Sequence, residues 1–141
     1  MADRTASAVW QGDLFEGSGM VSAENSGLFR DAPVTWASRT EDASGKTSPE
    51  ELIAAAHAAC FCMALSNELS SRGHPPARLQ VRATCTFEPP KVTTMTIDVT
   101  ANVADIDEAG FREGLEAAEQ SCPVSNALRG NVDVQVKGRL G

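Results

Sequence analysis

The feature that most constrains the fold is a long apolar segment in the middle of the chain, residues 52–65. Alanine and larger apolar residues dominate it, and only His57 interrupts its apolar surface. A helix over this segment has no polar face, and a helix that is apolar all round is buried all round. A chain of 141 residues can hardly enclose one helix on every side. The segment therefore predicts a central helix that also packs against a partner subunit.

Both ends of this helix carry recognisable signals. Residues 48–51 match a capping box, with Ser48 at the N-cap, Pro49 at the first helical position and Glu51 reaching back. At the other end, Gly73 and the two prolines that follow predict a stop near Arg72.

The remaining elements follow from periodicity and turn residues. Before the helix we expect three strands and a polar loop, at residues 5–10, about 14–22, 33–38 and 41–47. After it, apolar and polar residues alternate in two strands, 79–87 and 95–103, joined by a turn at 88–91. An amphipathic helix at 107–121, a short helix to Leu128 and a final strand at 132–140 complete the chain. This order predicts one α+β domain, residues 1–141, with antiparallel sheets around a long central helix.

Charge and composition exclude several classes of protein. The net charge is −7 and no basic run occurs, which disfavours nucleic acid as a partner. Charged residues stand close to the N-terminus without an apolar stretch, so no signal peptide is expected. The uncharged run 52–67 is too short, and too rich in Ala, Ser and His, to predict a membrane span. We therefore expect a cytoplasmic protein, whose four cysteines are packing residues, metal ligands or redox catalysts.

Two of the cysteines have the pattern of packing residues. Cys85 shares a strand face with Val81 and Phe87, and a small buried hydrophobe is the better interpretation. Cys62 lies on the apolar helix with no charged residue one turn away, so we interpret it as a packing residue too.

Cys122 and Cys60 are the candidates for chemistry. Cys122 precedes Pro123, which favours the first helical position, so Cys122 falls near an N-cap where free amides and the helix dipole favour a thiolate. A plain capping role is the alternative, although Ser caps better than Cys. Cys60 lies in the middle of the apolar helix, where burial opposes ionisation unless a cation and a hydrogen-bonding group reach the sulfur.

A metal site is the obvious rival for these cysteines. His57 and Cys60 are three residues apart and share a helix face, but Cys62 points elsewhere and the chain has no C-x-x-C motif. Both the ligand number and the spacing disfavour zinc. We expect no metal and no cofactor, and we interpret His57 as a core or interface histidine with a satisfied hydrogen bond.

Two motifs resemble those of a known family. Residues 47–61, TSPEELIAAAHAACF, closely resemble the central helix of the OsmC/Ohr family, and residues 122–128, CPVSNAL, resemble its second cysteine motif. The segments 8–12, AVWQG, and 36–39, WASR, look like the OsmC branch. The similarity runs over nearly the whole chain.

The resemblance implies a thiol-dependent peroxidase of oxidative or osmotic stress defence, built as an intertwined homodimer. Position by position, Cys60 resembles the peroxidatic cysteine and Cys122 the resolving one, so the resemblance implies a Cys60–Cys122 disulfide. Arg39 and Glu50 resemble the pair that activates the first thiol. Taken without the resemblance, Arg39 fits a solvated charge after a strand, and Glu50 fits a first-turn acid that favours the helix dipole.

Helix geometry adds a constraint to these roles. Glu50 and Cys60 stand ten residues apart on one helix, which corresponds to a rise of about 15 Å. A glutamate side chain cannot span that distance. If Glu50 acts on a thiol, it serves Cys60 of the other subunit, with the two central helices packed antiparallel near Ala55 and the active sites at the subunit interface.

The expected substrate follows from the apolar walls. A site lined by Leu52, Ile53, Phe61 and Met63 favours organic hydroperoxides over hydrogen peroxide. The reductant is expected to be an external thiol, which in the family is often a dihydrolipoyl protein or a small dithiol. Two alternatives stay open: a redox-sensing disulfide switch without significant turnover, and a non-catalytic ligand-binding dimer.

Overall fold

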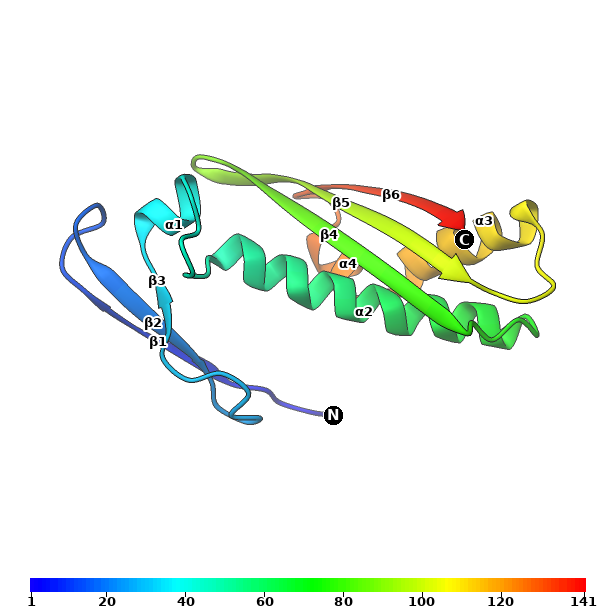
Figure 1. Ribbon diagram of the computed structural model, residues 1–141, viewed down its shortest axis with the longest axis horizontal. Coiled ribbons are helices and arrows are strands. Elements are labelled where there is room, and N and C mark those ends of the chain that lie inside the picture. Colours follow the sequence, from blue (N-terminus) through cyan, green and yellow to red (C-terminus); the bar gives the residue numbers. More distant parts are fainter. The chain divides into compact units, whose positions relative to one another are not determined.

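A computed structural model describes all residues, 1–141, as two compact units, Met1–Leu52 and Ile53–Gly141. The elements that make up each unit can be followed by colour in Figure 1. The first unit carries the N-terminal sheet, and the second carries most of the long helix together with the C-terminal sheet.

The N-terminal sheet has the order β1-β2-β3, with both pairings antiparallel. Its strands are β1 (Ala6–Gln11), β2 (Ser18–Ala23) and β3 (Ala32–Val34). The second strand begins later than predicted, because a turn occupies residues 14–16 and the Asp13 carboxylate accepts a hydrogen bond from the Glu16 amide at 2.7 Å.

The prediction of a strand over residues 33–38 is wrong in its second half. Only Ala32–Val34 is extended, and a short helix, α1 (Trp36–Thr40), follows. The Thr35 side chain accepts a hydrogen bond from the Ser38 amide, and the Ser38 hydroxyl accepts one from the Thr35 amide, so the two residues form a complete capping box. This local bonding gives the backbone an alternative to the strand ladder.

The long helix α2 (Pro49–Ser71) begins where the sequence predicts. The Glu51 amide donates to Ser48 Oγ at 3.2 Å, but the Glu51 carboxylate accepts from Thr47 Oγ1 at 2.7 Å instead of reaching the backbone of Ser48. At the far end, Gly73 adopts a left-handed conformation with φ of 84°. Glycine tolerates that conformation without steric cost, and the helix ends there.

The C-terminal sheet has the order β4-β5-β6. The strands β4 (Arg78–Glu88) and β5 (Lys91–Asn102) form an antiparallel hairpin, whereas β6 (Asp133–Leu140) pairs in parallel with β5. The sheets are thus antiparallel as expected, with this one exception. Two helices, α3 (Glu108–Ser121) and α4 (Pro123–Leu128), carry the chain from β5 to β6. A parallel pairing requires such a crossover.

The core of the second unit lies between the sheet and the helices (Figure 1). Phe61, Leu65 and Leu69 of α2 are fully buried in it, and burial of a side chain of this size stabilises the fold by about 2 kcal/mol. The helix α3 packs closely on both neighbours. A Cβ on Gly114 would lie 2.7 Å from a Leu69 methyl, and one on Gly138 of β6 would lie 2.7 Å from a Leu115 methyl.

The other face of α2 is not covered by the elements of the second unit. Between the first and last turns, the exposed positions of α2 form a stripe of small or apolar side chains, Ala55, Ala56, Ala59 and Met63, followed by the polar Asn67. Met63 is 70% exposed. By length and composition α2 could cross a membrane, with a mean hydropathy of 1.4 over its most apolar window, of which 22% is buried. The core helix of a soluble protein, which is mostly buried, meets the same criterion of length and composition.

Candidate active site

The two cysteines selected from the sequence come together in the second unit. Cys60 lies on α2, and Cys122 closes α3 and caps α4. Their sulfur atoms are 3.3 Å apart, and neither is in a disulfide. Cys122 is fully buried and Cys60 half-buried. A disulfide has an S–S length of about 2.05 Å, so a small approach of the two side chains would join them.

The first turn of α4 donates backbone hydrogen bonds toward both sulfur atoms. The Val124 amide bonds to the Cys60 sulfur, and the Ser125 amide donates to Cys122 Sγ at 3.5 Å. These amides lack partners inside a helix because they belong to its first turn. The pKa of Cys60 is nevertheless raised above the ordinary thiol value of 9.0, first by burial and then by the contact with Cys122, while the Val124 amide acts in the opposite direction.

The other two selected residues form an ion pair in the first unit. Arg39 Nε donates to Glu50 Oε1 and Oε2 at 3.0 and 3.2 Å, and Arg39 Nη2 lies 2.9 Å from Oε1. The guanidinium also lies over the Trp36 ring, 5.8 Å from its centroid. The carboxylate is nearly buried, whereas the Arg39 side chain is 29% exposed. A nearly buried, two-oxygen contact is a better-fixed pair than an open surface bridge.

A small apolar pocket adjoins this ion pair. Its volume is about 330 Å³, and its lining residues are Trp10, Leu14, Val34, Thr35, Trp36, Arg39 and Pro49. The pocket therefore combines aromatic and aliphatic walls with one cation, a combination that suits an apolar molecule with a polar end.

The side chains that the sequence predicted as substrate walls are placed differently. Phe61 is fully buried in the core and cannot line an open site, so that assignment is wrong. Met63 is exposed on the uncovered stripe of α2, and Leu52 and Ile53 are half-buried. Phe61 was misassigned because periodicity alone does not tell which face of a uniformly apolar helix meets its own sheet.

Neither of the remaining cysteines, Cys62 and Cys85, is in a disulfide. Burial raises the pKa of the Cys62 thiol, with the Val81 amide acting against that shift. Cys85 packs against the hydrophobic core from β4. No group of three or more His, Cys, Asp or Glu side chains is arranged to hold a metal ion.

Sequence reasoning missed a polar pair beside the sulfur atoms. His57 and Ser125 are both fully buried, and His57 Nε2 lies 2.7 Å from Ser125 Oγ. His57 Nδ1 is buried without a partner, so only half of the expected hydrogen bonding is satisfied. A signal was available: His57 precedes Cys60 by three residues and Ser125 follows Cys122 by three. That spacing puts each pair on one helix face.

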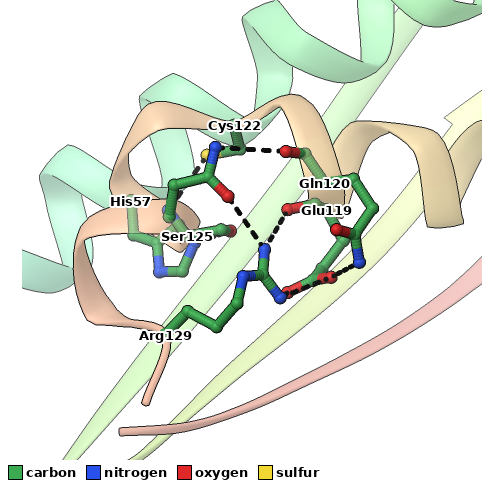
Figure 2. A network of polar contacts seen from close by, with 7 residues as sticks. His57, Glu119, Gln120, Cys122, Ser125 and Arg129 are labelled. Carbon is green, nitrogen blue, oxygen red and sulfur yellow. Dashed lines mark hydrogen bonds and ion pairs between the residues drawn. The ribbon is translucent and has the colours of Figure 1, made fainter. Parts of the chain in front are cut away.

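An outer group of polar side chains fixes α4 to the end of α3 (Figure 2). Arg129 Nη1 lies 2.9 Å from Glu119 Oε1, and Arg129 Nη2 donates to the Glu119 carbonyl at 2.9 Å and to Asn126 Oδ1 at 3.0 Å. Asn126 Nδ2 in turn donates to the Gln120 carbonyl at 3.1 Å. These bonds span the turn that bears Cys122 and hold its two helices together.

Comparison with known proteins agrees with this geometry. The sequence model of the OsmC-like protein family matches residues 41–137, which is more than half of the chain. The chain belongs to the OsmC family. The peroxiredoxin OsmC of Escherichia coli is 37% identical over 136 residues, covering 92% of this chain and 94% of that protein. The family predicted from the two cysteine motifs is confirmed.

Solved structures of OsmC relatives share the fold. The crystal structure of the organic hydroperoxide resistance protein OhrB of Bacillus subtilis matches with a TM-score of 0.71 at 25% identity, covering 96% of this chain and 98% of that one. An organic hydroperoxide resistance protein OsmC from Legionella pneumophila matches with a TM-score of 0.66 at 26% identity, covering 98% of both chains. The predicted α+β fold with a long central helix is thus confirmed within the OsmC family.

Proposed function

We propose that this protein is a cysteine-based peroxidase that reduces organic hydroperoxides to alcohols in hydroperoxide stress defence. The observation that carries the proposal is the 3.3 Å separation of the Cys60 and Cys122 sulfur atoms. Membership of the OsmC family supports it, and so do relatives named peroxiredoxin and organic hydroperoxide resistance protein.

In the first step the Cys60 thiolate attacks the terminal oxygen of the hydroperoxide. An S–O bond forms, the O–O bond breaks, and the departing alkoxide is protonated to the alcohol. Cys60 is thereby oxidised by two electrons to a sulfenic acid. Burial raises the pKa of this thiol, so the step needs a nearby cation that favours the thiolate and the leaving oxygen. Arg39, held by Glu50, is our candidate for that cation.

We propose that the Arg39–Glu50 pair of one subunit serves Cys60 of the other. The helix α2 is continuous from Pro49 to Ser71, and ten residues of helix correspond to a rise of about 15 Å. The uncovered stripe of α2, Ala55, Ala56, Ala59 and Met63, gives a second copy an apolar face to pack on. We therefore expect a homodimer in solution, and a monomer at micromolar concentration in sedimentation would contradict this arrangement.

The second step regenerates the enzyme through a disulfide. The Cys122 thiol attacks the Cys60 sulfenic acid, an S–S bond forms, and the hydroxyl leaves as water with the thiol proton. An external dithiol, for which a dihydrolipoyl protein is a candidate, then reduces the disulfide by exchange. We propose organic hydroperoxides over hydrogen peroxide because the pocket beside Arg39 has apolar walls that include Trp10 and Trp36.

The setting of this chemistry follows the same reasoning. We propose that the 141 residues form one domain. We also propose that the protein works in the cytoplasm, because a reducing compartment can re-reduce the disulfide after each turnover. Neither a membrane nor nucleic acid is expected as a partner, since the stripe on α2 suits a second copy and the net charge is −7.

The test is mass analysis of reduced protein after one equivalent of cumene hydroperoxide, followed by peptide mapping without reductant. We expect a loss of two hydrogens and a linked peptide that contains Cys60 and Cys122. An unchanged mass, or a link through Cys62 or Cys85, would contradict the assignment. Steady-state turnover with a dithiol then separates a peroxidase from a disulfide switch, which would react once and stop.

A further inference from the structure

The buried pair of His57 and Ser125 lies outside the proposed chemistry. Its hydrogen bond joins α2 to α4, and Figure 2 shows both residues beside Cys122. The sulfur contact likewise joins α2 to the residue that caps α4. His57 stands one helical turn before Cys60, and Ser125 stands at the third position of the helix that Cys122 caps. The hydrogen bond is therefore a second contact between the helices, one helical turn away from the contact between the sulfur atoms.

Ser125 contacts both His57 and the sulfur of Cys122, the proposed resolving cysteine. Its hydroxyl oxygen lies 2.7 Å from His57 Nε2, and its backbone amide donates to Cys122 Sγ at 3.5 Å. A hydrogen bond weakens steeply when its length or angle departs from the optimum. Sliding of α4 along α2 would therefore break the first bond and carry the Cys122 sulfur away from Cys60.

Packing alone does not call for a polar pair at this place. His57 Nδ1 is buried with no partner, and a buried polar atom without a hydrogen bond costs stability. Two apolar side chains of similar volume would fill the space without that cost. Burial lowers the pKa of His57 and so favours the neutral ring, although Glu119 acts against this shift. Unlike an apolar contact, the hydrogen bond between His57 and Ser125 fixes the distance and the orientation of α4 relative to α2.

We propose that His57 and Ser125 are positioning residues for closure of the Cys60–Cys122 disulfide. The inference rests on the proposed function, and it concerns the step after the peroxide is reduced. When the S–S bond forms, the S–OH bond of the sulfenic acid breaks and water leaves. The competing reaction is attack of the sulfenic acid on a second hydroperoxide, which gives a sulfinic acid and another alcohol. Holding the Cys122 sulfur close to Cys60 favours the disulfide over the sulfinic acid.

The decisive variants remove or restore the single hydrogen bond. Ser125→Ala deletes the hydroxyl and keeps the backbone amide that faces Cys122. His57→Leu deletes the other partner and fills the space, whereas His57→Gln keeps an amide that can reach Ser125. Ser66→Ala, a half-buried serine on the same helix, is the matched control. Each full-length variant is first checked for fold by circular dichroism and thermal unfolding.

The measurement is the partition of the oxidised products in the first turnover. Reduced protein is mixed with increasing cumene hydroperoxide and quenched, and intact mass separates disulfide from sulfinic acid. For Ser125→Ala and His57→Leu we expect an unchanged rate of the first hydroperoxide reduction and a disulfide step that is about tenfold to a hundredfold slower. More sulfinic acid then forms, at the expense of a second hydroperoxide. His57→Gln and Ser66→Ala should behave as the parent does. Closure of Ser125→Ala at the parent rate, without extra sulfinic acid, overturns the proposal.

A peroxide-free measurement separates this inference from the proposed function. The dithiol and disulfide forms are equilibrated in a glutathione redox buffer, and their ratio gives the effective concentration of the two thiols. We expect that value to fall at least about tenfold in Ser125→Ala, or in His57→Leu should the first variant not fold. An unchanged value overturns the positioning role. A parent protein that consumes no hydroperoxide contradicts the proposed function alone, and this equilibrium still decides the inference.

Discussion

The sulfur pair and the ion pair are held in opposite ways. Cys60 and Cys122 lie in the second unit, where backbone amides of α4 and a buried hydrogen bond surround them. Arg39 and Glu50 lie in the first unit, where charge and a neighbouring aromatic ring hold a partly exposed guanidinium. The difference teaches that the two halves of the proposed site should respond to different changes, the first to packing and the second to charge.

The largest effect should come from replacing each of the two cysteines in turn, because they are proposed to act in different steps. Cys60→Ser should abolish hydroperoxide reduction, because the thiolate proposed to attack the peroxide is then missing. Cys122→Ser should still reduce the first equivalent per site at the parent rate. Stopped-flow consumption of cumene hydroperoxide by the reduced proteins measures both. Equal loss in the two variants would mean that both sulfur atoms act in the first step.

The ion pair should show the next largest effect. Arg39→Ala should lower kcat/KM for an organic hydroperoxide by about a hundredfold to a thousandfold, since a donor to the developing charge is lost. Arg39→Lys should recover little of this loss, because an ammonium cannot make the two-oxygen contact that fixes the guanidinium on Glu50. Steady-state assays with a dithiol reductant give these values, and full recovery by lysine would reduce the role of Arg39 to that of a general positive charge.

The pKa of Cys60 tests whether the ion pair acts on the sulfur pair. Within the single chain burial raises the pKa of this thiol above 9.0. If Arg39 reaches it in the dimer, the pKa should be lower in the parent than in Arg39→Ala, and the parent should alkylate faster at neutral pH. The rate of iodoacetamide labelling as a function of pH, in a Cys62→Ser Cys85→Ser Cys122→Ser background, measures the shift. Identical profiles would place Arg39 outside the reach of the sulfur.

The smallest effect should be on stability in acid. The pKa of His57 is lowered in the folded chain, so the unfolded chain binds a proton that the folded one does not. The contribution to stability is present above the ordinary value of 6.5 and is lost as the pH falls toward the folded pKa. His57→Gln should remove this part of the pH dependence. Urea unfolding at several pH values between 7 and 5 gives the free energy of unfolding of both proteins. An equal change of this free energy with pH in the two proteins would exclude the contribution of His57.

The sequence predicted the elements whose signals are local and unopposed. The ends of α2 follow from Pro49 and Gly73, and the cap at Cys122 follows from Pro123. The short helix at Trp36–Thr40 was missed because its capping box, Thr35 and Ser38, lies within a stretch that also reads as a strand. Local signals of similar strength competed there, and the side-chain bonds favoured the helix.

Features that depend on contacts between distant segments were not predictable in the same way. The two cysteines were found through motifs, but their 3.3 Å contact depends on how α4 packs against α2. The bond between His57 and Ser125 joins residues 68 positions apart. Their spacing places each of them near one of the two cysteines, but the bond itself depends on how α4 packs against α2. The parallel pairing of β6 likewise depends on the crossover through α3 and α4, since alternation in one strand does not give the direction of its neighbour.

Cys122 also belongs to two helices at once. Its amide donates to the Ala118 carbonyl at the end of α3, and its carbonyl accepts from the Asn126 amide in α4. A change in the bonding of its sulfur therefore reaches the chemical environment of amides in both helices. In a nitrogen-15 correlation spectrum, the signals of Cys122, Val124 and Ser125 should move together on oxidation, which makes this turn a built-in reporter of the redox state.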